Sequence, residues 1–542
     1  DEFRDYILGF IFYKYLAEKM EIYADVILKP DSIKFREIDE NSELGIEYIT
    51  AIREEALDKL GYFLKPSELF REVAKRGNSD VEGVSNFIIE DLQKILNNIQ
   101  NSTMGTESEE DFDNLFEDMD LNSTKLGKNP EARNEIISKV LAHLDKIDFK
   151  LEQTEKDVLG DAYEYLIGQF ASGAGKKAGE FYTPQEVSTV LAKIVTTGKT
   201  KLRSIYDPTC GSGSLLLRVA KEVQEVSNFY GQELNRTTYN LARMNMILHD
   251  VHYRKFDIKQ EDTLEHPMHM DMKFEAIVAN PPFSANWSAN TLFMSDDRFS
   301  QYGKLAPKGY ADLAFVQHMI YHLSENGTLA VVLPHGALFR TGKEEHIRTY
   351  LIQEKNNIDT IIGLPKNLFY GTETPTCILV MKKCRENPND IFFIDGSSGF
   401  GQNKTKNKLR DKDIKKIIDT YRKRVEIENY SRKVTIEEIS KNNYNLGIQQ
   451  FITHESETNI EDEIEIVNGL KSIELEIIEI NKELHKQCKS LNVEFPAGNN
   501  IKLLKEYKNI LSYKLLSKNV RFKSENGIAF DEWKNKTLGD LF

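Results

Sequence analysis

The chain has 542 residues, of which 40% are hydrophobic and 29% charged, so it is long enough for several domains with cores of their own. It contains 71 Lys and Arg and 86 Asp and Glu, which gives a formal net charge of −15. This balance excludes a protein that binds nucleic acid nonspecifically through a broad basic surface. It leaves open a nucleic-acid enzyme whose contacts are local or are supplied by a partner.

The cysteines and the apolar runs indicate in which cellular compartment the protein is found. Four cysteines occur, far apart in the chain: Cys210, Cys377, Cys384 and Cys488. Their spacing fits neither a disulfide framework nor a zinc cluster, and it favours a reducing cytoplasm. No apolar run approaches the roughly 20 residues that cross a bilayer, so we expect no membrane association. Because the chain lacks an initiator methionine and starts inside a helix-like pattern, we expect the natural N-terminus to lie upstream.

Residues 1–155 predict a helical N-terminal domain. Apolar residues recur there in steps of four, three and four, the spacing of one helix face: Ile88, Leu92, Ile95 and Ile99. An acidic stretch at 106–120 carries no Lys or Arg. We interpret this stretch as a solvated surface, in preference to a repulsive wall that keeps DNA from one side of the protein.

Residues 156–455 predict an α/β domain. Short β-rich runs alternate there with longer helical stretches: 203–207, 228–233, 275–280, 328–333, 359–364 and 376–381. Such alternation is typical of a parallel sheet with helices on both faces. Ligands of these sheets bind beyond the carboxyl ends of the strands, so chemistry is expected there.

A glycine loop follows the first predicted strand. The strand ends at Asp207 and leads through Gly211, Ser212 and Gly213 to a helix beginning near Ser214. Such a turn lets a ligand approach the backbone closely at a helix N-terminus. The loop has neither the third glycine of a dinucleotide fingerprint nor the lysine of a P-loop, so phosphate binding is not favoured. Taken alone, the glycines could be there only because a tight turn has no room for a side chain.

Acidic residues end the next two predicted strands. Glu233 lies 22 residues after Gly211, where a carboxylate can accept hydrogen bonds from the ribose hydroxyls of a nucleoside. Asp262 follows the next strand and suits the exocyclic amine of an adenine, although a turn-capping aspartate is an equally good interpretation. Together with the glycine loop, these residues indicate an adenosine-containing ligand without a triphosphate, and S-adenosylmethionine fits.

The segment Asn280-Pro281-Pro282-Phe283 ends the fourth predicted strand, because neither proline can donate a ladder hydrogen bond. The turn leaves the Asn280 side chain and backbone carbonyls free to accept hydrogen bonds from the amine of a flat heterocycle, and Phe283 could stack on the ring. We therefore predict direct methyl transfer to that amine. An ordinary turn is the less favoured alternative.

DPTCGSG, NPPF and EFYTP together resemble motifs of amino-methylating DNA methyltransferases. The nearest resemblance is to the modification (M) subunit of type I restriction–modification systems, an N6-adenine DNA methyltransferase. The resemblance covers most of the chain: FRDYILGFIFYKYL (3–16), DAYEYLIGQFASGAGKKAGEFYTP (161–184), YNLARMNMILHD (239–250), APKGYADLAFVQHM (306–319), VVLPHGALFR (331–340) and GLPKNLFYGTETPTCILV (363–380). EFYTP precedes the glycine loop, which precedes NPPF, as in the gamma group of these enzymes.

This resemblance implies a Rossmann-like S-adenosylmethionine-dependent methyltransferase sheet with an N-terminal helical domain and a C-terminal helical extension. It implies that Asn280, Pro281, Pro282 and Phe283 hold a flipped adenine. The implied cofactor site, without a metal, contains Glu180, Phe181, Tyr182, Thr183, Pro184, Gln185, Asp207, Gly211, Ser212, Gly213, Ser214, Glu233 and Asp262. The implied partners are duplex DNA, a specificity (S) subunit, a second M subunit and a restriction (R) subunit. Locally, Thr183 to Glu186 also predicts a capping box with Pro184 at the first helical position.

Residues 456–496 predict a helix for subunit assembly. Apolar residues form a heptad seam there: Ile466, Leu470, Ile473, Ile477, Ile480 and Leu484. Packing on its own domain and pairing with a partner helix both remain open. Residues 497–542 form a basic tail that resembles a specificity-subunit fragment. A further basic run at 403–416 is either a solvated face or a phosphate contact.

Two other functions compete with DNA methylation. Methylation of a protein glutamine or an RNA base needs the same NPP-aromatic turn, although such enzymes generally lack the long helical domain. A scaffold with a relic cofactor site is disfavoured by the intact Asn280, Phe283 and Glu233. His266, His269 and Asp271 could be drawn as a metal site, but we interpret them as part of a loop.

Overall fold

The computed structural model describes residues 3–79, 86–151, 157–173, 183–369, 372–403 and 406–452. The predicted assembly helix and the basic tail lie outside the described residues, as do Glu180, Phe181 and Tyr182. Within the described ranges, no helix combines the length and the apolar composition that a membrane crossing requires.

The N-terminal region is helical, as predicted. Its α-helices are α1 (Arg4–Leu28), α2 (Glu43–Lys59), α3 (Phe70–Gly77), α4 (Ile89–Ser102), α5 (Glu109–Phe112) and α6 (Pro130–Asp145). The first half of α1 is apolar on nearly every side, and residues such as Phe12, Tyr13 and Leu16 have no exposed surface. A helix that is apolar all round must be enclosed by others, so α1 is the centre of this region.

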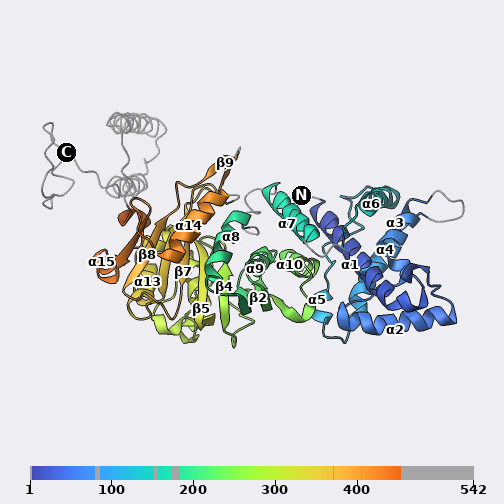
Figure 1. Ribbon diagram of the computed structural model, residues 1–542, viewed down its shortest axis with the longest axis horizontal. Coiled ribbons are helices and arrows are strands. Elements are labelled where there is room, and N and C mark those ends of the chain that lie inside the picture. Colours follow the sequence, from blue (N-terminus) through green and yellow to red (C-terminus); the bar gives the residue numbers. More distant parts are fainter. Residues whose placement is uncertain are drawn as a thin grey trace, which may run out of the picture. The chain divides into compact units, whose positions relative to one another are not determined.

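Nine strands form the main sheet, in the order β11-β8-β6-β7-β5-β4-β1-β2-β3 (Figure 1). They are β1 (Lys201–Asp207), β2 (Glu225–Glu233), β3 (Phe256–Gln260), β4 (Phe274–Ala279), β5 (Leu323–Pro334), β6 (Ile358–Gly363), β7 (Thr376–Met381), β8 (Asp390–Asp395) and β11 (Ser431–Thr435). Each of the six predicted strands is present. A separate hairpin consists of β9 (Gly401–Asn403) and β10 (Lys406–Lys408).

The sheet is mixed, so the prediction of a parallel sheet was wrong in part. Strands β1 to β5 pair in parallel, whereas β7 runs antiparallel to both of its neighbours, β5 and β6. β11 is also antiparallel to β8. Strands β6 and β7 follow one another in the chain and pair directly, and a connection that returns at once to the neighbouring position reverses the strand direction.

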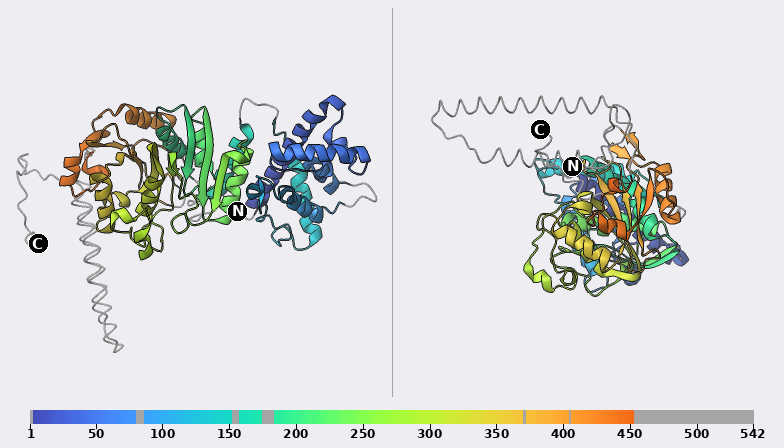
Figure 2. Two further views of the ribbon diagram at one scale, coloured as in Figure 1. Left: turned by 90° about the horizontal axis from the view of Figure 1, so that it is seen from below. Right: turned by 90° about the vertical axis from the view of Figure 1, so that its left-hand side faces the viewer.

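Helices cover both faces of the sheet, as predicted (Figure 2). One face packs against α8 (Gln185–Val195), α9 (Ser214–Ala220), α10 (Arg236–Leu248) and α14 (Asp411–Lys423), and the other against α11 (Asp312–His322), α13 (Lys343–Gln353) and α15 (Ile436–Lys441). Two further helices are α7 (Val158–Gly173), which comes before the first strand, and the short α12 (Gly336–Phe339). Along β4, Ala276 and Val278 belong to one core while Ile277 and Ala279 belong to the other. This alternation makes the central strand apolar throughout.

The acidic stretch at 106–120 is solvated in part, as predicted, because acids such as Glu107, Glu109 and Glu110 are exposed, but it also makes internal contacts that the sequence did not indicate. The buried Arg243 of α10 donates hydrogen bonds to the carbonyl oxygens of Glu110 and Asp113, at 2.6 and 3.0 Å. Arg236 of the same helix forms a 2.5 Å ion pair with Glu117. The basic partners of these acids and carbonyls lie 119 to 133 residues away in the chain.

Candidate active site

The strand order reverses between β1 and β4, and this reversal locates the crevice in which open α/β sheets bind ligands. Strand β1 ends at Asp207, and Asn280 directly follows β4. The two strands are hydrogen-bonded neighbours in parallel orientation. The glycine loop and the NPPF segment, 73 residues apart, therefore begin at the same edge of the sheet.

The glycine loop has the backbone geometry that its glycines predict. Gly211 and Gly213 have φ angles of +55° and +75°, in the left-handed region that favours glycine. Gly213 is the N-cap of α9, which begins at Ser214. The Gly211 amide donates a 3.0 Å hydrogen bond to Oε2 of Glu233, so the loop is tied directly to the end of β2. Glu233 Oε1 accepts from the amide of Asn235 at 2.8 Å.

Ser212 and Ser214 lie together beside α10. Their hydroxyl groups are 2.9 Å apart, and the buried Asn245 donates through Nδ2 to the Ser212 carbonyl oxygen at 2.9 Å. Cys210 is buried, and its Sγ would lie 3.0 Å from a Cβ added at Gly231. Gly231 is thus needed for the loop to lie against β2, and Cys210 fills space there.

The buried Asp207 and the partly exposed Glu233 are two carboxyl groups without a basic partner in the described part of the chain. Burial raises the pKa of Asp207 to about 8; hydrogen bonds from Thr209 oppose this shift and the nearby Glu233 adds to it. Burial also raises the pKa of Glu233, against hydrogen bonds from Asn235 and Gly211. A site with this electrostatic character favours a cationic ligand, which would stabilise the ionised carboxylates.

Asp262 caps its own turn. Its Oδ1 accepts from the amides of Leu264 and Glu265, at 2.9 and 3.2 Å, as the capping interpretation predicted. The alternative role, binding an adenine amine, is untested and remains a prediction. Gln232, next to Glu233, also holds this loop, because its Nε2 donates to the carbonyl oxygen of His266 at 2.9 Å.

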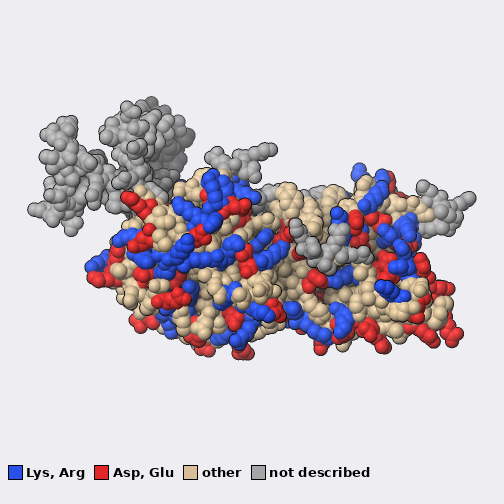
Figure 3. All heavy atoms as spheres, in the orientation of Figure 1, with Lys and Arg blue, Asp and Glu red and all other residues tan. Residues whose placement is uncertain are grey.

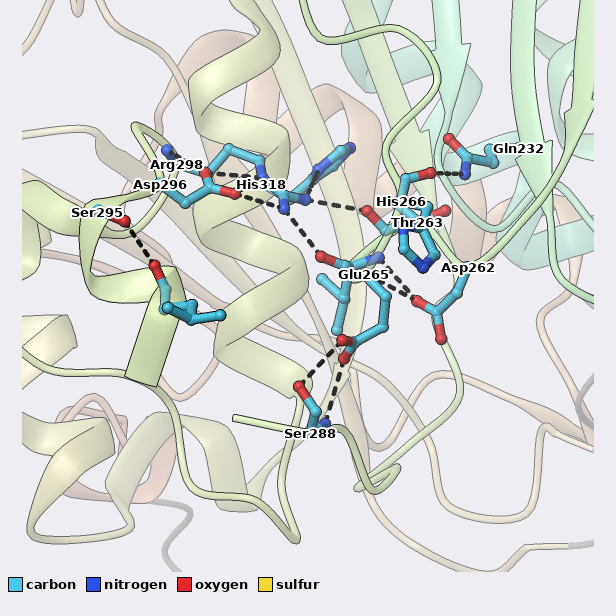
Figure 4. A network of polar contacts seen from close by, with 12 residues as sticks. Gln232, Asp262, Thr263, Glu265, His266, Ser288, Ser295, Asp296, Arg298 and His318 are labelled. Carbon is cyan, nitrogen blue, oxygen red and sulfur yellow. Dashed lines mark hydrogen bonds and ion pairs between the residues drawn. The ribbon is translucent and has the colours of Figure 1, made fainter. Parts of the chain in front are cut away.

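A buried arginine fastens the same loop from the other side of the crevice. Arg298 donates to the carbonyl oxygens of Thr263 and Leu264, at 3.0 and 2.8 Å, and forms a 2.7 Å ion pair with Asp296 (Figure 4). It also bonds to Nδ1 of His318 at 3.1 Å. Because Arg298 can only donate, this nitrogen accepts and the His318 proton lies on Nε2. Burial and nearby charges hold the pKa of His318 well below its usual value, which keeps the ring neutral.

The loop after β3 is also linked to the segment that follows NPPF. The Glu265 carboxylate accepts hydrogen bonds from the hydroxyl and the amide of Ser288, at 3.0 and 3.3 Å (Figure 4). The Thr263 hydroxyl donates to the carbonyl oxygen of Pro208 at 2.5 Å. The loops after β1 and β3 and the segment that follows NPPF are therefore joined by hydrogen bonds.

Asn280 has an unsatisfied acceptor. Its Oδ1 is buried and accepts no hydrogen bond from any described residue. A buried amide oxygen without a partner costs about 1–3 kcal/mol, so this one is expected to receive a hydrogen bond from a ligand. Phe283 is partly exposed and meets Phe369 edge to face, with ring centroids 5.5 Å apart and planes at 78°. Phe369 thus fixes the ring that we predict to stack on a base.

The turn after NPPF is held by residues to which the sequence analysis gave no role. Ser284 has a φ of +51°, and its amide donates to Oδ1 of the buried Asp312 at 2.8 Å. Arg340 forms a 3.0 Å ion pair with Asp312 and donates to the Ser284 hydroxyl at 3.2 Å. Asp312 and Arg340 lie within two of the segments that carry the family resemblance, which was the available signal, whereas Arg298 lies in none.

The start of α8 differs from the prediction. Helix α8 begins at Gln185 with Pro184 as its N-cap, and no side chain caps it, so the predicted capping box is absent. Pro184 adopts an extended backbone (ψ 134°), which places it before the first helical residue. Thr183 is thereby outside the capping position. No observation tests whether Thr183, Pro184 and Gln185 contact a cofactor, and that assignment remains a prediction.

Comparison with known proteins agrees with this architecture. The family described as N-6 DNA Methylase matches residues 154–460, and the family described as HsdM N-terminal domain matches residues 1–144. The type I restriction enzyme MpnII methylase subunit of Mycoplasma pneumoniae is 39% identical over 509 residues, covering 90% of this chain and 92% of its relative. The MjaVII methylase subunit of Methanocaldococcus jannaschii is 31% identical and covers 72% and 68%.

The chain belongs to the type I restriction enzyme methylase subunits. It is an N6-adenine DNA methyltransferase, and its closest functional alternatives, methylation of protein or RNA and a non-catalytic scaffold, find no support in these relationships. The fold agrees: the crystal structure of the type I methyltransferase subunit from Streptococcus thermophilus superimposes with a TM-score of 0.75 at 40% identity, covering 83% of this chain and 95% of that one.

Proposed function

We propose that this methylase subunit transfers a methyl group from S-adenosylmethionine to N6 of an adenine that has been rotated out of duplex DNA. A separate specificity subunit would select the target sequence, and a second M subunit and a restriction subunit would complete the assembly. The unsatisfied Oδ1 of Asn280 carries the proposal, because it is a buried acceptor at the carboxyl end of β4.

The acidic crevice suits this cofactor. S-Adenosylmethionine carries an ammonium, a sulfonium and a carboxylate, a net positive charge that complements the buried Asp207 and the partly exposed Glu233, which have no basic partner among the described residues. Glu233 retains lone pairs beyond its two backbone hydrogen bonds and could accept from ribose hydroxyls. The loop glycines leave space for the ligand to approach the backbone.

The acceptor site needs only orientation and hydrogen bonding. When bound, S-adenosylmethionine supplies a methyl group on a positively charged sulfur, which is a good leaving group. Asn280 Oδ1 would accept a hydrogen bond from the adenine N6 amine and turn its lone pair out of conjugation with the ring. Phe283, braced by Phe369, would stack on the base. The N6–carbon bond forms as the sulfur–carbon bond breaks, and the displaced N6 proton passes to solvent.

The test is methyl transfer by the Asn280→Ala variant in complex with the specificity subunit, with radiolabelled S-adenosylmethionine and duplex DNA. We expect the rate to fall at least a hundredfold, because the amine loses its acceptor, while cofactor affinity changes less than threefold. Asn286→Ala, an exposed asparagine of the same segment, is the matched control. Label on adenine at the wild-type rate would contradict the assigned role of Asn280. No label from the wild-type complex with bound cofactor would contradict the proposed reaction.

A further inference from the structure

A basic hairpin lies beside the predicted base-binding pocket. β9 and β10 pair antiparallel, and Lys406, Lys408, Arg410 and Lys412 follow one another at every second position. In a protein with a net charge of −15, four cations in seven residues form a local departure from the average. The sequence alone left open whether this run is a solvated face or a phosphate contact.

Three hydrogen bonds fasten the hairpin to the loop after β6. The Asn407 amide donates to the Asn367 carbonyl oxygen at 3.0 Å, and Asn407 Nδ2 donates to that of Lys366 at 2.8 Å. Lys406 Nζ donates to the carbonyl oxygen of Phe369 at 2.7 Å. The ring of Phe369 contacts Phe283, so Phe369 is the single residue that connects the hairpin to the predicted stacking surface.

Three lysines of this surface carry charge that no ion pair with a described residue engages. Lys366, Lys408 and Lys412 are exposed and form no ion pair with any residue that the structure describes. Exposed lysines elsewhere are of both kinds: Lys139 pairs with Glu135 at 2.5 Å, whereas Lys125 and Lys304 form no ion pair with a described residue.

We name Lys366, Lys406, Lys408, Arg410 and Lys412 the basic rim. Arg410 is neutralised by Asp413 at 2.7 Å, and the exposed acids nearest in sequence are Asp411 and Glu373. Figure 3 shows Lys and Arg side chains gathered on the surface over α14 and the hairpin. The rim therefore offers three lysines without an ion pair among the described residues, close to the Phe283–Phe369 contact; the nearest acids are Glu186 for Lys408 and Asp413 for Lys412.

A DNA backbone is the partner that this surface fits. A target adenine that enters the pocket must leave the helix stack, and the phosphates on either side of it are then drawn toward the pocket mouth. Lysine ammonium groups bind phosphate as point charges and carry no sequence preference. Such contacts would position the strand while another subunit reads the bases.

We propose that the basic rim binds the phosphates of the target strand next to the flipped adenine, an inference that rests on the proposed function. Lys366, Lys408 and Lys412 would supply the charge, while Lys406 and Asn407 hold the hairpin in place. Each phosphate that a lysine neutralises releases condensed counterions, so the contacts set the salt dependence of binding.

The test compares wild type with the triple variant Lys366→Ala, Lys408→Ala, Lys412→Ala, each in complex with the specificity subunit. DNA affinity is measured over a range of salt concentrations, with a duplex that contains the target and one that does not. We expect the slope of log K against log salt to become shallower by about 2–3, at roughly 0.9 per phosphate contact. Affinity should fall more for the duplex that contains the target, because only there is an adenine flipped and its flanking phosphates drawn to the rim, with kcat at saturating DNA unchanged.

The matched control replaces three paired surface lysines, Lys59, Lys139 and Lys441, by alanine and should leave the slope unchanged. An unchanged slope in the rim variant would overturn the proposal. So would weaker binding of the specificity subunit or of S-adenosylhomocysteine with normal DNA binding, which would assign the rim to a protein or to the cofactor. Failure of the wild-type complex to methylate DNA would instead refute the proposed function.

Discussion

Asp207→Asn should stabilise the protein against unfolding at neutral and alkaline pH. The folded chain holds the Asp207 carboxyl at a pKa of about 8, against 3.8 for an ordinary aspartate. A group with a raised folded-state pKa keeps its proton in the native state after the unfolded chain has lost it. The native state then binds more protons, and stability falls as the pH rises from about 4 to about 8.

The magnitude follows from these two pKa values. At 1.36 kcal/mol per pH unit, the difference between 3.8 and about 8 amounts to about 6 kcal/mol over the whole interval. An asparagine at this position cannot ionise, and its Oδ1 can still accept the hydrogen bonds that Thr209 donates to Asp207 Oδ1. The stability advantage of the variant should therefore grow by about 1.4 kcal/mol per pH unit and level off above about pH 8.

Urea unfolding of the full chain, followed by circular dichroism at several pH values, measures this difference. Asp31→Asn, at an exposed aspartate, is the matched control for the substitution itself. The reasoning is refuted if the stability difference between wild type and Asp207→Asn is the same at about pH 5 and about pH 8. The expected cost to function is separate: loss of the anionic form should weaken cofactor binding.

Two further predictions concern the cofactor loops. Binding of S-adenosylmethionine at neutral pH should release a proton, because the cationic ligand favours the ionised form of Asp207. Calorimetry in two buffers of different ionisation enthalpy counts the released protons. A binding enthalpy that is the same in both buffers means that no proton is released and would contradict the electrostatic argument. Arg298→Lys should raise the cofactor KM about tenfold or more with a smaller change in kcat, because a lysine cannot keep the bonds to Thr263, Leu264 and Asp296 together. Thermal melting checks folding, and an unchanged KM in folded enzyme would show that Arg298 does not position the loop.

Local sequence patterns were sufficient for six of the strands, for the glycine loop and for the helical N-terminal region, whereas β8 and β11 were not predicted. Gly211 and Gly213 have the positive φ angles that a tight strand-to-helix turn requires, and β4 stops before Pro281 because proline cannot continue the ladder. The capping box failed although its residues fit the pattern. The backbone of Pro184 stays extended, and the helix begins one residue later than a proline at the first helical position would require.

Local sequence patterns did not predict the contacts between residues that are far apart in the chain. The acidic stretch has the composition of a solvated surface, yet Arg236 and Arg243 bind it from α10. Arg298 has the character of an ordinary loop arginine in the sequence, and its burial with Asp296 and His318 depends on packing between α11 and the sheet. Side-chain partners of this kind have no periodicity or spacing along the chain.

The sequence by itself determined the order of the motifs, the positions of six strands and the membership of a methylase family, because these depend on residue types at short range. Only the tertiary structure decided the antiparallel direction of β7, the joining of the loops after β3 and β4 through Glu265 and Arg298, and the isolation of Asn280 Oδ1 from any described partner. Direction, enclosure and the lack of a hydrogen-bond partner are properties of the space around a residue. They arise when segments far apart in the chain pack together and exclude water.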